Sequence, residues 1–102
     1  MNAAIARARA YGVAVAFADL GEWGPSELRA EYDPNGPVIR LNIRVAERFA
    51  PNELGEFVTH AIAHELYHHR ERIGEVATIA DPGARERAAD DYAQALLRRE
   101  RA

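Results

Sequence analysis

The chain carries the stretch His64-Glu65-Leu66-Tyr67-His68 and, after 17 intervening residues, the stretch Glu86-Arg87-Ala88-Ala89-Asp90. The first stretch reads HExxH and the second reads ExxAD. On an α-helix, His64 and His68 lie one turn apart on one face, with Glu65 rotated by about 100° from His64. The spacing therefore predicts two helices that face each other through these motifs.

The residue types in the two stretches favour a zinc site. The imidazoles of His64 and His68 and the carboxylate of Glu86 make a three-ligand set that leaves a fourth position for water. Zinc lowers the pKa of such a water towards about 7, and Glu65 is placed to take its proton and pass it to a leaving amine. Asp90 lies one turn after Glu86 and is suited to hold the ring N–H of a ligand histidine, with His64 as the expected one.

The second stretch gives the zinc interpretation most of its weight, because HExxH alone recurs by chance. Helical spacing places acidic and apolar positions of the last helix on one stripe that is expected to face the core, namely Glu86, Ala89, Asp90, Ala93, Leu96 and Leu97. Buried carboxylates require a cation, so this stripe favours a metal or a protonated histidine. The alternative is that Glu86 and Asp90 lie in solvated first turns, where acids suit the helix dipole.

Other polar residues near the motifs have alternative roles. His60 is expected at the surface or the core edge in preference to the edge of the groove, and His69 is expected to be packed and hydrogen-bonded. A peptidase also requires an electrophile that stabilises the oxyanion. The residues that offer one are Tyr11, Tyr32, Tyr67, Tyr92, His60 and the arginines, and the sequence does not choose among them.

Length and composition predict one globular domain that covers residues 1–102. Apolar residues make up 48% of the chain and charged residues 28%, which is typical of a folded soluble protein. A formal charge of −3 gives no basic footprint for direct binding of nucleic acid. The chain has no cysteine, so a metal would be held by histidines and carboxylates. The oligomeric state is not predicted.

The N-terminal region contains one pattern that resembles a targeting signal. Ala16-Phe17-Ala18 is similar to a signal-peptidase site and follows an apolar run that begins at Tyr11. That run is short, is interrupted by Gly12 and alternates as a strand does. We therefore expect a cytoplasmic protein, with secretion less favoured. No stretch approaches the length of a transmembrane helix, and no membrane partner is expected.

Start and stop signals divide the chain into helices and strands. Asn2 is expected to cap a helix that reaches about Tyr11, where Gly12 stops it. Pro51 starts a helix that Gly74 ends, so this helix spans about Pro51–Arg72. The other expected elements are a strand at Val13–Ala18, a loop at Gly21–Ser26, strands at Glu27–Tyr32 and Val38–Arg44 around a turn at 33–37, and a helix from Asp81-Pro82 to about Arg99.

The third expected strand alternates between a solvent face and a core face. The solvent face is predicted to carry Val38, Arg40, Asn42 and Arg44, and the core face Ile39, Leu41 and Ile43.

These motifs resemble those of the gluzincins, zinc peptidases that join HExxH to a downstream glutamate. Residues 64–69, HELYHH, followed by residues 86–97, ERAADDYAQALL, are similar to the ImmA/IrrE-type metallopeptidases and to single-domain minigluzincins. Their pattern is roughly HELGH and then ExxA(N/D)xFAxxLL. The resemblance implies a small α+β, zincin-like domain. Its sheet of about three strands, mixed or antiparallel, would pack on the HExxH helix and the C-terminal ExxAD helix.

The resemblance also implies function. His64, His68 and Glu86 would be zinc ligands, Glu65 the base and Asp90 the residue that orients a ligand. The substrate would be a protein or peptide, and several family members act on one regulatory protein, such as a helix-turn-helix repressor. An edge strand above the cleft would hold the substrate by main-chain pairing, and Val38–Arg44 is the expected strand.

Two departures from the family pattern favour alternatives. Tyr67 stands where a small residue is usual and is expected to crowd the site, and the common partner domains are missing. The second hypothesis is accordingly a catalytically weak or latent, zinc-stabilised protein-interaction domain. A third is a metal-free regulatory protein with acidic helix ends. An open fourth coordination position indicates the enzyme, and a filled one indicates the interaction domain.

Overall fold

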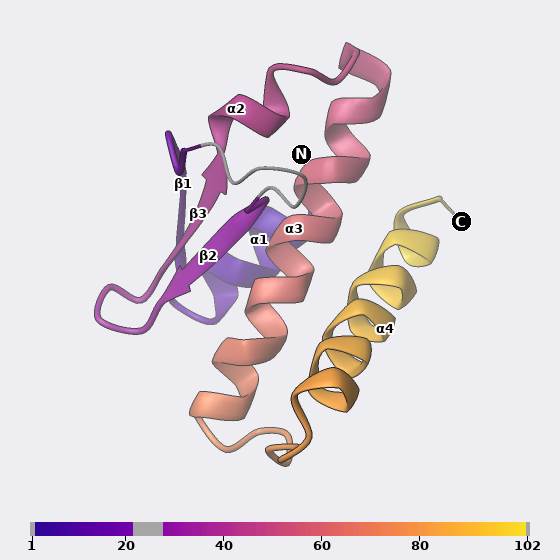
Figure 1. Cartoon of the computed structure of the whole chain (residues 1–102). Coiled ribbons are helices and arrows are strands. Elements are labelled where there is room, and N and C mark those ends of the chain that lie inside the picture. The colour runs from indigo at the N-terminus through magenta and orange to yellow at the C-terminus, as the bar shows by residue number, and fades with distance from the viewer. Residues whose placement is uncertain (1, 22–27, 102) are drawn as a thin grey trace.

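The computed structural model describes residues 2–21 and 28–101. These residues form a small α+β domain with a three-stranded sheet (Figure 1). Its elements in chain order are α1 (Ala3–Ala10), β1 (Ala14–Ala18), β2 (Ala30–Asp33), β3 (Val38–Asn42), α2 (Ile43–Ala46), α3 (Pro51–Arg72) and α4 (Pro82–Arg101). Apart from Gly21, the predicted loop at 21–26 lies outside the described residues, as does Glu27.

Helices α1 and α3 begin and end at the predicted signals, and α4 begins at its predicted one, whereas α2 was not predicted. The side chain of Asn2 accepts hydrogen bonds from the backbone N–H groups of Ala4 and Ile5 and so caps α1. Gly12 and Gly74, which follow α1 and α3, have φ angles of 73° and 79°, a conformation that glycine adopts without steric cost. The predicted bounds of α3 are confirmed, and α4 extends slightly past the predicted end.

The sheet is mixed, with the strand order β1-β3-β2. β1 pairs with β3 in parallel, and β2 pairs with β3 in an antiparallel manner. The prediction that Val38–Arg44 forms an edge strand is therefore wrong, because β3 lies in the centre and β2 is an edge. The reason is burial: Ile39 and Leu41 of β3 are fully buried, and such a strand is best placed between two neighbours.

The end of β3 also differs from the prediction. Asn42 was expected on the solvent face, but it is fully buried and donates to the backbone carbonyls of Gly21 and Leu28. Its side-chain oxygen accepts from the backbone N–H of Arg44, so Asn42 caps α2. Ile43 and Arg44 consequently lie in α2, and Ile43 is exposed rather than in the core. A short amide that bonds to nearby backbone competes with continuation of the strand.

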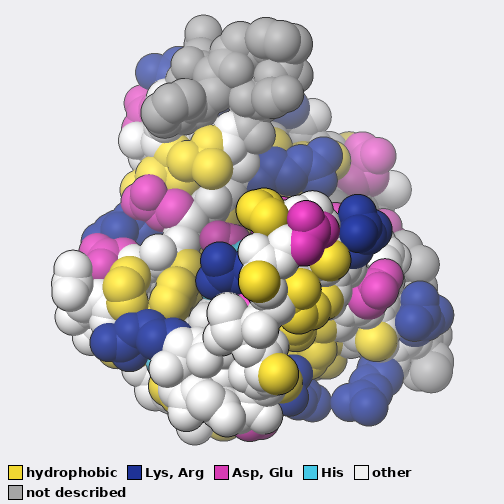
Figure 2. Space-filling model, turned by 60° about the horizontal axis from the view of Figure 1, so that its bottom comes forward, with side chains coloured by type: hydrophobic (Ala, Val, Ile, Leu, Met, Phe, Trp, Pro, Cys, Tyr) yellow, Lys and Arg dark blue, Asp and Glu magenta, His cyan; other side chains and the backbone are white. Residues whose placement is uncertain are grey.

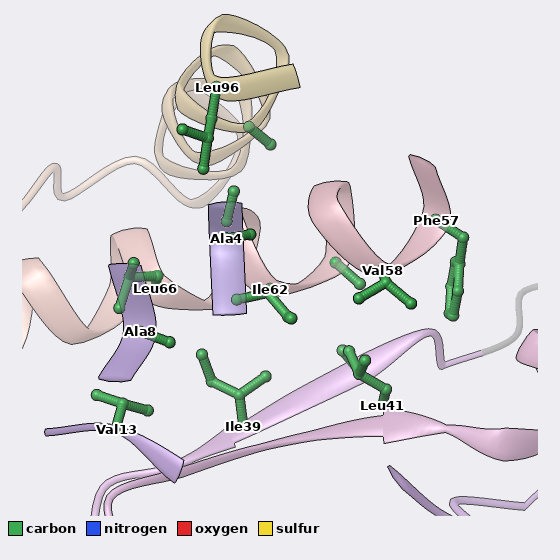
Figure 3. Close-up of a cluster of buried hydrophobic side chains, with 14 of the residues drawn as sticks. Ala4, Ala8, Val13, Ile39, Leu41, Phe57, Val58, Ile62, Leu66 and Leu96 are labelled. Atoms are coloured by element: carbon green, nitrogen blue, oxygen red, sulfur yellow. The ribbon is translucent and has the colours of Figure 1, made fainter. Parts of the chain in front are cut away.

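The core lies between the sheet and α3 (Figure 3). Ile39 and Leu41 project from the sheet towards α3, Ile39 near Ile62 and Leu41 near Val58. The side chains of Ile39, Leu41, Ile62 and Leu66 are fully buried. Alanines of α1 fill one side of this cluster, and Leu96 reaches it from α4. α3 thus packs against the sheet on one side and against α4 on another (Figure 1). Among the described residues, no helix is long and apolar enough to cross a membrane.

Candidate metal centre

α3 presents both histidines of HExxH on one face. His64 and His68 are one turn apart, and their ring centroids are 5.2 Å apart. Both rings are partly buried. Figure 2 shows one face of the molecule, where acidic, basic and hydrophobic side chains are mixed and almost no histidine surface is visible.

The first turns of α4 bring the predicted third ligand to these rings. Asp81 caps the helix by accepting from the backbone N–H of Ala84 at 2.8 Å. Glu86 follows, and its Oε2 lies 3.1 Å from Nε2 of His68 and 3.5 Å from Nε2 of His64. Ligands bonded to zinc at about 2.0–2.1 Å in a tetrahedron are about 3.3–3.4 Å apart. The observed separations therefore fit a shared ion.

The opposite nitrogen of each ring contacts a carboxylate. Nδ1 of His64 lies 2.8 Å from Oδ1 of Asp90, which is the contact predicted for that residue. Nδ1 of His68 lies 2.8 Å from Oε1 of Glu71. An ionised carboxylate only accepts, so each neutral ring carries its proton on Nδ1 and has a lone pair on Nε2. Two lone pairs and an oxygen of Glu86 then converge, an arrangement that suits a cation.

The burial of the acids differs from the prediction. The side chains of Glu86 and Asp90 are 58% and 54% exposed, so they do not lie on the core-facing stripe. The apolar members of that stripe, such as Ala89 and Ala93, are buried. Both acids lie at the margin of this apolar stripe, where α4 faces the imidazoles. The distances between Glu86 and the histidine rings therefore favour a metal, and buried charge does not.

Glu65 lies beside the histidines and is half-buried. Burial raises the pKa of Glu65 to about 7, the charge of His64 opposes this rise, and Glu86 adds to it. Glu65 can offer an oxygen within 4.8 Å of ring nitrogens of both His64 and His68. Oε2 of Glu86 lies 3.1 Å from Nε2 of His68 and 3.5 Å from Nε2 of His64, so the two histidines have a carboxylate from each helix nearby.

Two cavities border Glu65 and Glu86. The larger, of about 470 Å³, is also lined by residues 28–30, which lead into β2, and by His60, Ala61, His64 and Asp90. The smaller, of about 390 Å³, is also lined by Tyr32, His68, Pro82 and Arg85. The two cavities follow β2, so the strand beside the site is β2 and not the predicted Val38–Arg44.

The structure gives the positions of three residues near the motifs: His60, His69 and Tyr67. His60 lines the larger cavity with Nε2 3.9 Å from Asp90, at the groove edge rather than at the preferred surface or core-edge place. His69 is buried, with Nδ1 2.6 Å from the hydroxyl oxygen of Tyr32, which confirms a packed, hydrogen-bonded residue. Tyr67 is buried beside Tyr92 and lines neither cavity, so the predicted crowding is wrong.

Among the predicted electrophiles, the cavities beside Glu65 include His60, Arg29, Tyr32 and Arg85. Tyr11 instead donates to Glu75 at 2.6 Å.

Sequence reasoning missed Glu71. Its carboxylate contacts His68 and receives hydrogen bonds from Nε of Arg85 at 3.0 and 3.1 Å. Burial alone would raise the pKa of Glu71, but the hydrogen bonds from His68 and Arg85 outweigh burial and hold it below its usual value. Sequence spacing could have identified Glu71, because seven residues along a helix place it within about 20° of His64, on the face that carries the metal motif.

Comparisons of the chain with known protein families, with curated proteins and with solved structures found no match.

Proposed function

We propose that the chain is a zinc-dependent metallopeptidase with a minimal zincin-like fold. The observation that carries the proposal is the convergence of three electron-pair donors: Nε2 of His64, Nε2 of His68 and Oε2 of Glu86. The separations of 3.1 and 3.5 Å fit the edges of a tetrahedral site. With three protein ligands, the fourth position is left for water or substrate.

Glu65 is the proposed base. When bound, zinc would act as a Lewis acid and lower the pKa of a water at the fourth position. Glu65 lines both cavities and lies beside both histidines, so its carboxylate can take a proton from an attacking water and give it to the leaving amine. The charge of an ion at the histidines would favour the ionised form that a base requires.

An extended peptide is the substrate shape that suits the cavities. Both cavities are lined by residues in or next to β2, which pairs with β3, lies at the edge of the sheet and contacts α3. A peptide lying along β2 would pass Glu65 and could pair with the strand through main-chain hydrogen bonds. A regulatory protein with an extended segment is accordingly the proposed substrate. We propose a cytoplasmic location, supported by the segment Ala14–Ala18, which is a strand of the sheet.

The second candidate is a zinc-stabilised interaction domain without turnover. It is favoured by the position of Glu65, whose oxygen comes within 4.8 Å of ring nitrogens of His64 and His68 and could fill the fourth coordination position. In that case Glu65 would be a ligand, and its loss would weaken zinc binding. In the peptidase, the loss of Glu65 removes turnover and leaves zinc bound.

The experiment compares wild type, Glu65→Gln and the control Glu47→Gln, which changes an exposed acid outside the site. Zinc content is measured by elemental analysis, and turnover is measured on casein and on fluorogenic peptide mixtures. We expect wild type and Glu47→Gln to bind zinc and cleave, and Glu65→Gln to bind zinc with turnover reduced by about 10²–10⁴-fold. Zinc-free wild type, or cleavage that Glu65→Gln leaves unchanged, contradicts the proposal.

A further inference from the structure

We propose that Glu71 is the principal positioning residue of the metal site, holding the ring of His68 and, through Arg85, the start of α4 that carries Glu86. The inference rests on the proposed zinc site. The sequence indicates Asp90 for this kind of role, but the contacts favour Glu71.

Glu71 has the geometry of a bridge between the two helices. It lies on the last turn of α3, three residues after His68, and its Oε1 is 2.8 Å from Nδ1 of that ring. Nε of Arg85, on the first turn of α4, is 3.0 Å from Oε1 and 3.1 Å from Oε2. One carboxylate therefore contacts a proposed ligand and the neighbour of another.

The carboxylate of Glu71 selects the tautomer of His68. In its contacts with His68 and Arg85 this carboxylate is ionised, so it accepts a hydrogen bond from Nδ1–H and donates none. The neutral ring of His68 is then the Nδ1–H tautomer. Its Nε2 lone pair points towards Oε2 of Glu86, 3.1 Å away. The opposite tautomer would place its lone pair against the carboxylate of Glu71, which is closer, at 2.8 Å, and 2% exposed, whereas that of Glu86 is 58% exposed and better solvated.

Burial distinguishes Glu71 from Asp90. The side chain of Glu71 is 2% exposed, whereas that of Asp90 is 54% exposed, although both lie 2.8 Å from a ring nitrogen. Water screens and competes for the contact of an exposed carboxylate, and a buried one has few alternative partners. Glu71 should therefore restrict its histidine more strongly than Asp90 restricts His64.

Arg85 extends this restraint to the third ligand. It immediately precedes Glu86, and its Nε contacts both oxygens of Glu71. A change at Arg85 leaves the contact between Glu71 and His68 in place but frees the start of α4. Zinc affinity should then fall because Glu86 is no longer held near the rings, while the tautomer of His68 stays unchanged.

The first test uses metal-free protein, both wild type and Arg85→Gln. Long-range proton–nitrogen NMR spectra, recorded at about pH 8.5 on the neutral side of an ordinary histidine titration, identify the protonated ring nitrogen. We expect Nδ1–H for His68 in wild type and in Arg85→Gln. An Nε2–H ring in wild type overturns the inference, whether or not the protein binds zinc.

The second test measures zinc affinity by competition with a chromophoric chelator. Loss of a residue that orients a ligand typically reduces metal affinity by about 10–100-fold. We expect Glu71→Gln to fall in this range and Asp90→Asn, the matched amide substitution, to fall less. An equal or larger loss in Asp90→Asn overturns the inference.

The proposed function and the inference fail in different ways. Wild-type protein that binds no zinc contradicts the proposed function, while the tautomer of His68 still tests Glu71 on its own. If Glu71→Gln does not fold, as judged by circular dichroism, Arg85→Gln replaces it. We then expect weaker zinc binding with the Nδ1–H tautomer kept, and zinc affinity equal to wild type overturns the coupling to α4.

Discussion

At the scale of single residues, two tyrosine hydroxyls have different surroundings. The hydroxyl of Tyr32 contacts Nδ1 of buried His69 at 2.6 Å. The hydroxyl of Tyr92 is buried and has no hydrogen-bond partner among the described residues. Tyr92 contributes its ring instead, with the guanidinium of Arg70 4.8 Å from the ring centre. The same substitution at these two positions should therefore give different results.

We predict that Tyr32→Phe lowers the free energy of unfolding by about 1–3 kcal/mol, because it leaves a buried imidazole nitrogen of His69 without its partner. Tyr92→Phe is the matched control and should change stability by less than about 0.5 kcal/mol or raise it slightly. Urea unfolding of metal-free protein measures both. Equal losses in the two variants would contradict the assigned hydrogen bond.

The pH dependence of stability has a contribution from Asp33. The backbone N–H of Asn35 and the side chain of Arg40 hold the pKa of Asp33 below its usual value. A carboxyl whose pKa is lower in the folded state stabilises the protein above its unfolded pKa of about 3.9, and this stabilisation is lost as pH falls through the folded value. Wild type should therefore be more stable than Asp33→Asn near pH 6, and the difference should vanish near pH 2. Thermal melts at several pH values measure it, and a difference that is independent of pH would show that charge is not its source.

At the scale of the elements, the helices were more predictable than the sheet. Asn2, Gly12, Pro51 and Gly74 act within a few residues of themselves, so a local reading finds the helix ends. Strand order depends on pairing between distant segments, and nothing local to β3 places it in the centre. The predicted alternation held for Ile39 and Leu41 and failed at Asn42, where hydrogen bonds to distant backbone replace the strand pattern.

Asn42 should be one of the more sensitive positions, because it joins β3, α2 and the chain before β2. We predict that Asn42→Ala lowers the free energy of unfolding by about 2–4 kcal/mol, since it removes a helix cap and leaves two part-buried backbone carbonyls without their donor. Asn35→Ala, in an exposed turn, is the control and should cost less than about 0.5 kcal/mol. Chemical unfolding compares them, and a small effect at Asn42 would contradict its role.

In the candidate site, too, the features set by spacing within one helix were predictable, and those set by the packing of two helices were not. Helical spacing alone brought together His64, Glu65 and His68, and the acids of α4 were predicted to meet them. Sequence could not show that Glu86 and Asp90 would be exposed, because the depth of a helix in the fold depends on the packing of α4 against α3. Glu71 was missed because its partner Arg85 lies on another helix.

At the scale of the whole molecule, the core and the candidate metal site are separate. The fully buried side chains of Ile39, Leu41, Ile62 and Leu66 belong to one cluster between the sheet and α3, and none belongs to the site. Removal of metal should therefore leave the fold intact, unlike in small domains that fold only around zinc. The site instead joins α3 to α4, so bound metal should add stability to a chain that is already folded.

We predict that zinc at about 100 times its dissociation constant raises the free energy of unfolding by about 2.7 kcal/mol. For a domain of this size the melting temperature should rise by roughly 10–20 °C, and a chelator should reverse the rise without changing the circular dichroism spectrum at 25 °C. A variant with both His64→Ala and His68→Ala serves as the control, since it should melt at the same temperature with zinc or chelator. Unfolding of wild type by the chelator at 25 °C would show that the core depends on the metal. Equal melting temperatures of wild type in zinc and chelator would favour the metal-free regulatory protein.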